Sequence, residues 1–481
     1  MNIQDKRQNI TYKAGITRSY VESISMKKFK DYQPDQMVLL PTSLTSWLPD
    51  DHPVHFMSEV VEKLDLKLIY NEYRDLRGQP PYNPKMMVKV LIYAMTKGIH
   101  SSRKIEKALY EDVGMRVLSG NQQPDHWTLS EFRRRHNYAL GELFVQTVQL
   151  ADKAGLVKLN HVATDGTKIK ANASKHKAMS YGRMAKEEER LRKEVKRILE
   201  KMDETDRKED KKYGNRRGDE LPEELSTRQK RLEAIEKAKA ELEEEARQKL
   251  EEEQDKRQKD AQKKGKNYTP RKEEKDAKPK DKDQRNFTDS ESRIMKDSNK
   301  AFIQGYNAQA TVDAETHIIV GAELSNIAGD SPHLVNQIEE VENNTGRKPK
   351  NALSDAGYYS EENLKALIDK GINPYIPPGK IKHNEWRTTP APRGPIPKDA
   401  TEKYLMWRKL RTKPGKKIYK LRQTSVEPVF GFIKEQMHLR QFLLRGQDKV
   451  SSTWRFACAV HNLLKIFRAG VVLEKGPAMG T

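Results

Sequence analysis

The sequence predicts an α/β protein. An all-helical N-terminal region is followed by a mixed sheet with flanking helices, and a long, charged helical hairpin is inserted in the chain that forms the sheet. Apolar residues recur at helical spacing up to about residue 157. Short runs rich in β-branched residues then occur on both sides of a strongly charged block, residues 174–285. The 481 residues are enough for two to four domains.

The composition favours a polyanionic partner. The chain has 91 Lys and Arg against 70 Asp and Glu, a formal net charge of +21. This excess favours nucleic acid, because each neutralised phosphate releases counterions, although an anionic membrane surface would also attract it.

The sequence also gives expectations about the protein's location. No segment approaches the ~20 apolar residues that span a bilayer, and residues 1–18 lack the apolar run of a signal peptide. The one cysteine, Cys458, excludes a disulfide within the chain. We therefore expect a cytoplasmic protein with no membrane partner.

The N-terminal part divides into an arm and a helical domain. Residues 1–35 show little apolar periodicity, and we expect an arm that is in part disordered. Residues 36–157 are expected to form a DNA-binding domain of helix-turn-helix type. Its candidate phosphate contacts are Arg103, Arg133, Arg134 and Arg135, and Thr128 is a candidate helix cap. A plain helical bundle with solvated arginines would show the same pattern.

The stretch from His161 to Asn172 is expected to be a strand with an acidic residue inside it. Residues 158–173 would begin the sheet, and Asp165 lies in the middle of the strand, beside Gly166. Burying a carboxylate is costly unless a partner balances it, and a metal ion is one candidate. Taken alone, the stretch fits a turn at a strand end, formed by the two residues, better than a metal site.

Residues 174–285 are expected to form an insertion in the sheet. Two runs with apolar residues four and three apart predict two long antiparallel helices, and residues 213–222 between them carry turn signals. From about residue 254 to 285 the apolar positions vanish, and we expect a mobile, linker-like segment.

The sheet is expected to resume within residues 286–468. Residues 301–313 and 317–324 predict paired strands, and residues 334–342 a helix. Asp355 ends another short strand before a helix that Ser360 caps, which places it at the carboxyl-terminal edge of a sheet. Asp330 competes for this second acidic position, but its surroundings predict a helix cap.

A helix expected over residues 418–441 carries four candidate site residues. They are Tyr419, Arg422, Glu427 and Lys434. The last two are seven residues apart and would share one helical face. A later helix contains Trp454 and His461, which we expect in the core, and residues 469–481 form a tail.

Several motifs together resemble those of a known family. They are Asp165-Gly166-Thr167, Gly305-Tyr306-Asn307-Ala308-Gln309, Asp355-Ala356-Gly357-Tyr358 and Val426-Glu427-Pro428-Val429-Phe430-Gly431. In this order they resemble bacterial insertion-sequence DDE transposases of the IS4/IS5 kind. The charged insertion, with its segment 218–225, is most similar to the IS1182 family.

The resemblance implies an RNase H-like fold and a nucleotidyl transferase. Asp165, Asp355 and Glu427 would be the catalytic residues and would hold Mg²⁺ or Mn²⁺, two ions in all. The enzyme would bind the terminal inverted repeats of an insertion sequence, then cut and join double-stranded DNA as a nucleoid-associated homodimer. A catalytically inactive DNA-binding protein with the same fold, a repressor or a domesticated transposase, is the alternative, and a scaffold built on the charged hairpin is a third.

The resemblance also implies DNA contacts, but the spacing departs from the family's pattern. Tyr419, Arg422 and Lys434 match a signature of Tyr, Arg, Glu and Lys, with one extra residue before the Glu. On a continuous helix this rotates Arg422 by about 100°. The helix could instead begin after Arg422. All four residues remain candidates, and the match to the family is stronger for Glu427 and Lys434 than for Tyr419 and Arg422.

Overall fold

The computed structural model of the chain describes the residues that build the sheet, its helices and the insertion. These are residues 29–32, 43–73, 78–174, 177–213, 223–263, 265, 277–297, 300–379, 393–397 and 399–471. The expected N-terminal arm apart from residues 29–32, most of the turn expected in the insertion, and the tail beyond residue 471 lie outside the described residues.

The N-terminal region is helical, as expected. It comprises a 3₁₀ turn, Leu44–Trp47, and helices α1 (Pro53–Lys63), α2 (Lys67–Tyr70), α3 (Pro84–Thr96), α4 (Ser102–Glu111), α5 (Val113–Leu118), α6 (His126–Arg135) and α7 (Asn137–Lys153). Helix α6 is capped by Asp125, whose side chain accepts from the backbone N–H of Thr128. The expected cap at Thr128 was wrong, because the chain turns into the helix three residues earlier and Asp is among the best capping residues.

A six-stranded mixed sheet forms the centre of the protein. Its strands are β1 (His161–Lys170), β4 (Arg293–Lys296), β5 (Phe302–Asp313), β6 (Ile319–Ser325), β7 (Asn351–Ser354) and β8 (Asn373–Tyr375). The order is β4-β5-β1-β7-β8, and β6 also pairs with β5. Strand β1 runs antiparallel to β5 and parallel to β7. The strands expected on both sides of the insertion are confirmed.

Helices cover the sheet and close the chain. They are α10 (Leu334–Thr345), α11 (Glu361–Asp369), α13 (Glu402–Arg411), α14 (Lys413–Gly431) and α15 (Gln447–Arg468), with a π-helical turn at Phe432–Gln436. In α15, Trp454 is fully buried and donates to the carbonyl of Gln309 at 3.0 Å. His461 is buried as well, and burial lowers its pKa to about 3. Both residues are core residues, as expected.

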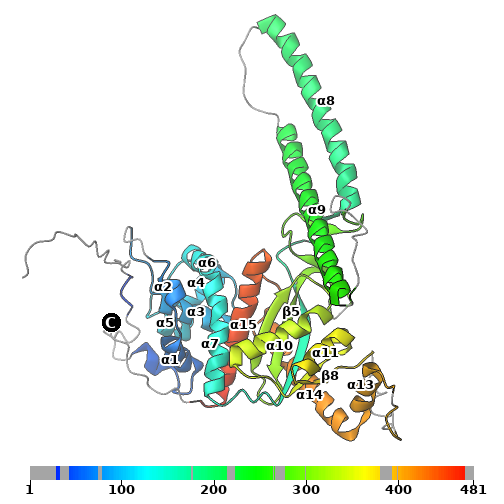
Figure 1. The fold of residues 1–481 in the computed structure, drawn as a ribbon. Coiled ribbons are helices and arrows are strands. Elements are labelled where there is room, and N and C mark those ends of the chain that lie inside the picture. The colour runs from blue at the N-terminus through cyan, green and yellow to red at the C-terminus, as the bar shows by residue number, and fades with distance from the viewer. Residues whose placement is uncertain are drawn as a thin grey trace, which may run out of the picture.

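One hydrophobic core joins the N-terminal helices to the sheet. It extends from Val54 in α1 to Ile466 in α15, and α15 packs along α7 between the helical region and the strands (Figure 1). The N-terminal helices therefore hold a fixed position relative to the sheet. Within the described part of the chain, no helix has both the length and the apolar character that crossing a membrane requires.

The insertion is a helical hairpin that projects from the body of the protein (Figure 1). Two short paired strands, β2 (Ala178–Ser180) and β3 (Gln284–Asn286), lie at its base, and its arms are α8 (Tyr181–Tyr213) and α9 (Glu223–Lys263). The arms share a small core of their own: Met184, Leu191, Ile235, Ala238 and Leu242.

Helix α9 is longer than the sequence predicted. A linker was expected from about residue 254, but the helix continues to Lys263. Lys, Glu, Gln and Arg are good helix formers, and Arg257 pairs with Glu253 one turn earlier, at 3.5 Å. A helix can thus continue without an apolar face, which explains the error.

Candidate active site

Asp165 is a largely enclosed carboxylate inside the central strand, with 20% of its side chain exposed. It lies within β1, opposite Ala310 of β5, so the alternative of a strand-end turn was wrong. Burial raises its pKa to about 6; Asp355 and Asp330 act in the same direction, while Arg422 and the N–H of Gly166 oppose the rise. The site therefore holds a carboxylate whose negative charge needs a nearby cation.

Arg422 supplies that cation. Its Nη1 lies 3.0 Å from Oδ2 of Asp165, and its Nη2 lies 3.8 Å from Oε1 of Glu427. Only 12% of the Arg422 side chain is exposed. Burial works against its charge, but Asp165, Tyr419, Asp355 and Glu427 outweigh this, and the pKa of Arg422 is raised. One guanidinium thus connects the carboxylate of β1 with that of α14.

The strand register places Asp355 beside Asp165. Strands β1 and β7 are parallel with Thr164 opposite Ser354, so the residue after each of these is one of the two acids. Asp355 also accepts from the N–H of Gly357 at 2.8 Å and caps a 3₁₀ turn, Ala356–Tyr358. Its position at the carboxyl end of a strand is confirmed, and its charge acts on both Asp165 and Arg422.

Helix α14 runs without interruption from Lys413 to Gly431. The possibility that it begins after Arg422 is therefore wrong. Arg422, which one extra residue was expected to rotate away, contacts Asp165, whereas Lys434 contacts the carbonyl of Lys168. A long guanidinium side chain can reach the buried carboxylate despite the rotation that one extra residue causes. Glu427 is more open, with 59% of its side chain exposed.

Tyr419 and Lys434 lie on either side of this centre. Tyr419 hydrogen-bonds with Arg422, and its pKa is raised, mainly by burial and further by Asp355 and Asp165. Lys434 lies in the π-helical turn and donates to the carbonyl of Lys168 at 3.4 Å. Burial, with Arg440, lowers its pKa. Because a π-helical turn is wider than an α-helical turn, Lys434 and Glu427, seven residues apart, do not share one helical face as on a regular α-helix.

Asp330 is a further acidic residue near the site. It precedes a short 3₁₀ turn, Ser331–His333, but its side chain makes no capping hydrogen bond. The expected capping role was therefore wrong. Its Oδ1 instead accepts from Lys168, Asn307 and Gln309. The alternation of β5 was a usable signal, because it places the two amides on the same face of the strand.

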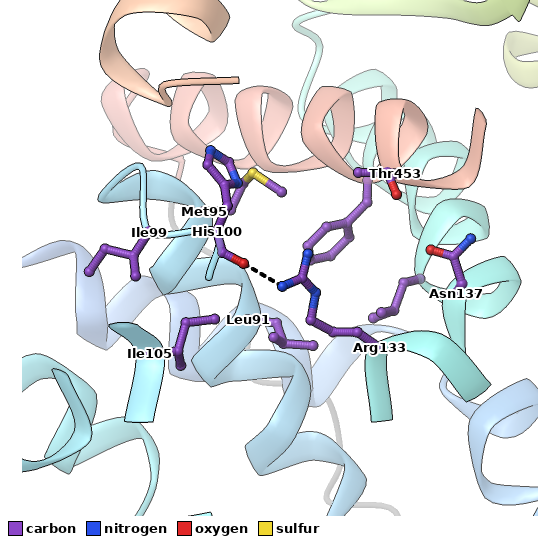
Figure 2. A pocket seen from close by; sticks show the side chains of 10 residues that line it. Leu91, Met95, Ile99, His100, Ile105, Arg133, Asn137 and Thr453 are labelled. Carbon is purple, nitrogen blue, oxygen red and sulfur yellow. Dashed lines mark hydrogen bonds between the residues drawn. The ribbon is translucent and has the colours of Figure 1, made fainter. Parts of the chain in front are cut away.

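Arg133 is only partly exposed, and its guanidinium is held by contacts within the protein. Its Nη1 donates to the carbonyl of His100 at 2.5 Å, and burial lowers its pKa. It lines a cavity of about 20 Å³ between α3, α4, α6 and α15, among apolar side chains that include Leu91, Ile105 and Phe456 (Figure 2). This position suits a structural role.

The other candidate arginines of the N-terminal region are exposed. Arg134 forms a two-pronged pair with Glu131 at 2.8 and 2.6 Å. Arg135 contacts Glu72, and Arg103 is exposed on α4. Arg134 can therefore present charge to a partner, although it must share that charge with a neighbouring carboxylate.

The donors near Asp165 suit a hard divalent cation, since they are carboxylate oxygens. The carboxylate of Asp165, whose pKa is raised, and two further carboxylates, Asp355 and Glu427, lie around the guanidinium of Arg422, and Asp330 lies near Asp165. Within the described ranges, however, no three His, Cys, Asp or Glu residues are already arranged to hold a metal ion.

Two family models match the chain. Residues 42–135 match a transposase domain of the family DUF772, and residues 277–463 match a transposase DDE domain. The second range contains Asp330, Asp355 and Glu427, whereas Asp165 lies between the two. No curated protein and no solved structure matches the chain. Over these two ranges the chain is therefore similar to a transposase domain and to a transposase DDE domain, in that order.

Proposed function

We propose that the protein is the DNA transposase of an insertion sequence, which binds terminal inverted repeats and catalyses metal-dependent strand cleavage and strand transfer. The observation that supports this most directly is the convergence of Asp165, Asp355 and Glu427 on Arg422. These acids come from a central strand, a neighbouring strand end and a later helix. That order is the one expected of an RNase H-like catalytic domain. The match to a transposase DDE domain supports the same conclusion.

Asp165, Asp355 and Glu427 are the residues that would hold Mg²⁺ or Mn²⁺. With two such ions bound, these residues would hold the metal chemistry that activates a water or a 3′-hydroxyl and stabilises the departing oxygen. Asp165 lies in β1 and Asp355 directly follows β7, and the pairing of these two strands up to Thr164 and Ser354 sets the positions of the two acids. Glu427 lies on an exposed helical face, where its side chain is free to adjust.

Two basic side chains and one tyrosine beside the acids are the proposed phosphate contacts. Arg422, Tyr419 and Lys434 surround the acidic centre and would position the scissile phosphate and stabilise its charge. Arg134 is proposed as a contact of the N-terminal region because it is exposed. Arg133 is left out of this set because its guanidinium is committed inside the protein.

The partner is proposed to be double-stranded DNA, both the element's ends and the target, with the protein acting as a homodimer. The net charge of +21 supports a nucleic-acid partner. The proposed affiliation with the IS1182 family rests on the long charged hairpin of α8 and α9, which interrupts the sheet after its first strand.

The proposal is tested with purified protein and a duplex that carries the repeats flanking the gene. Asp165→Asn, Asp355→Asn and Glu427→Gln should each reduce Mg²⁺-dependent cleavage by at least about a thousandfold while keeping duplex binding in Ca²⁺. Glu435→Gln is the matched control, because that carboxylate is 60% exposed and pairs with Arg440 instead. Cleavage retained by Asp165→Asn would contradict the assignment. Tight binding of the ends by the wild type without cleavage in Mg²⁺ or Mn²⁺ would favour the inactive DNA-binding protein.

A further inference from the structure

The carboxylate of Asp330 is held by three side chains at once. Its Oδ1 accepts from Nζ of Lys168 at 3.0 Å and from the side-chain amides of Asn307 and Gln309, both at 2.9 Å. Among the described residues, all of its hydrogen bonds end on this one oxygen. Three donors on one carboxylate oxygen fix its position far more tightly than a single surface ion pair would.

The three donors come from β1, the strand that contains Asp165, and from β5, the strand that pairs with it. Lys168 is three residues after Asp165 on β1. On β5, Gln309 lies opposite Gly166 and Asn307 opposite Lys168. Asp330 therefore lies over the stretch of sheet that directly follows Asp165.

The same network reaches the second acidic strand end. The hydroxyl of Tyr358 donates to Oε1 of Gln309, whose amide nitrogen donates to Asp330. Tyr358 is fully buried and is three residues after Asp355. Asp330, Gln309 and Tyr358 thus connect the turn after Asp355 with the strand that carries Asp165.

Gly166, next to Asp165, leaves room for this carboxylate, and Gly357, two residues after Asp355, lies in ordinary contact range of it. A Cβ at Gly166 would lie 2.7 Å from Oδ1 of Asp330, and one at Gly357 would lie 3.6 Å from Oδ2. No side chain could be added at Gly166 without displacing the carboxylate or its amide partners. The glycine of each acidic motif therefore packs against Asp330.

A buried amide oxygen lies next to the carboxylate without a hydrogen-bond partner among the described residues. Asn307 is fully buried, and its Oδ1 has no hydrogen-bond partner among the described residues. It would be 2.9 Å from a Cβ at Gly166. An unpaired buried amide oxygen is costly, and proteins tolerate such groups mainly where a site needs them.

We propose that Asp330 is a positioning residue of the active site: it neutralises Lys168 and fixes the chain after Asp165 and after Asp355, so that these two carboxylates meet the same cation. This inference rests on the proposed function, since it assumes that the two acids bind a divalent cation. It assigns to Asp330 a role through its neighbours rather than direct contact with substrate.

The charge balance gives the inference a measurable consequence. Asp165, Asp330, Asp355 and Glu427 face Lys168, Arg422 and Lys434, four carboxylates against three cations. Asp330→Asn removes one negative charge and leaves Lys168, 15% exposed, without its anion. Lys168→Met removes the cation and leaves the carboxylate.

The test is a Mn²⁺ titration of the full-length protein, with and without repeat duplex, followed by calorimetry. Asp330→Asn should weaken Mn²⁺ binding about tenfold or more, as loss of a group that orients metal ligands does. The double variant Asp330→Asn/Lys168→Met should recover most of the affinity because it removes both charges. Glu339→Gln is the matched control, since Glu339 pairs with Lys370 at 2.9 Å on the surface.

The outcomes separate this inference from the proposed function. If Asp165→Asn weakens Mn²⁺ binding and a folded Asp330→Asn does not, the role of Asp330 is overturned and the proposed function stands. A wild type that neither binds Mn²⁺ nor cleaves overturns both. If Asp330→Asn does not fold, Lys168→Met alone decides: several-fold tighter Mn²⁺ binding supports the role, and unchanged or weaker binding overturns it.

Discussion

Arg422 on α14 pairs with Asp165 on β1 at 3.0 Å, across 257 positions of sequence. The pair connects the central strand with the helix that carries Glu427, and it lies where little water can screen the charges. Its two members depend on each other. Without the guanidinium, the carboxylate of Asp165 would be buried beside Asp355 and Asp330 with no cation in direct contact.

Arg422→Ala should therefore make the protein more dependent on divalent metal. In the absence of metal we expect a loss of about 1–3 kcal/mol in unfolding free energy, the usual cost of an unsatisfied buried partner. Mn²⁺ should then raise the thermal midpoint more in the variant than in the wild type, because the carboxylate no longer has a competing cation. Thermal unfolding at several Mn²⁺ concentrations measures both effects.

Two variants control this experiment. Arg440→Ala removes an exposed arginine that pairs with Glu435, and its response to Mn²⁺ should equal that of the wild type. Arg422→Ala combined with Asp165→Asn should lose the extra response. A Mn²⁺ shift in Arg422→Ala no larger than the wild-type shift would show that the guanidinium and the metal do not compete.

Arg133 and Arg134, neighbours in sequence, should behave differently when replaced. Arg133→Met should cost about 1–3 kcal/mol of stability, because the carbonyl of His100 and the cavity wall lose their partner. Arg134→Ala should leave stability nearly unchanged, since its pair with Glu131 is exposed to solvent. Chemical denaturation of the two variants gives the comparison.

For DNA binding we expect the reverse: replacing Arg134 should have an effect, and replacing Arg133 should not. If Arg134 contacts a phosphate, Arg134→Ala should reduce the slope of log affinity against log salt concentration by about one. Arg133→Met, measured where it remains folded, should keep the wild-type slope. An unchanged slope in Arg134→Ala would remove that residue from the proposed DNA contacts.

The sequence was sufficient to predict the main elements of the fold. Alternating and helical patterns located β1, β5, β6 and α15, because these elements bury one face or all of their residues. Asp355 could be placed at a sheet edge because a strand, a glycine and a capped helix follow one another locally. Each of these inferences needed only a short window of sequence.

The errors came from tertiary contacts, which a single pattern does not contain. Asp330 has the flanking residues of a helix cap, yet donors from β1 and β5 hold its carboxylate. Arg422 seemed displaced by one extra residue, yet its side chain reaches Asp165. Arg133 belongs to a basic run, yet it alone of the three lines the internal cavity, together with residues of α3, α4 and α15.

Glu340 on α10 should make stability depend on pH. Burial raises its pKa to about 7 from 4.5, although Arg455 pairs with it at 2.6 Å. Because the folded state binds the proton more tightly, this residue's contribution is full below about pH 4.5 and is lost as the pH rises through 7. The wild type should lose roughly 1–3 kcal/mol relative to Glu340→Gln between pH 5 and pH 8.

The comparison requires unfolding free energies of both proteins across that pH range. Taking the difference cancels the contributions of other titrating groups, among them Asp165. Glu342→Gln serves as control, because Glu342 lies on the same helix and pairs only at long range, 3.8 Å from Lys348. A wild-type to Glu340→Gln difference that stays constant with pH would show that Glu340 is ionised throughout.

Gly166 is the position where a single added methyl group should do most harm to the site. Its Cβ would lie 2.3 Å from Nε2 of Gln309 and 2.7 Å from Oδ1 of Asp330. Gly166→Ala should therefore cost about 1–3 kcal/mol and weaken Mn²⁺ binding, although alanine in place of glycine ordinarily favours a strand. Gly431→Ala, with no atom within 4 Å of the added carbon, should be neutral or slightly stabilising. The methyl group at Gly166 cannot fit without moving the Asp330 carboxylate or its amide partners. Equal Mn²⁺ binding by the two variants would therefore mean that the position of Asp330 over Gly166 does not affect metal binding by Asp165 and Asp355.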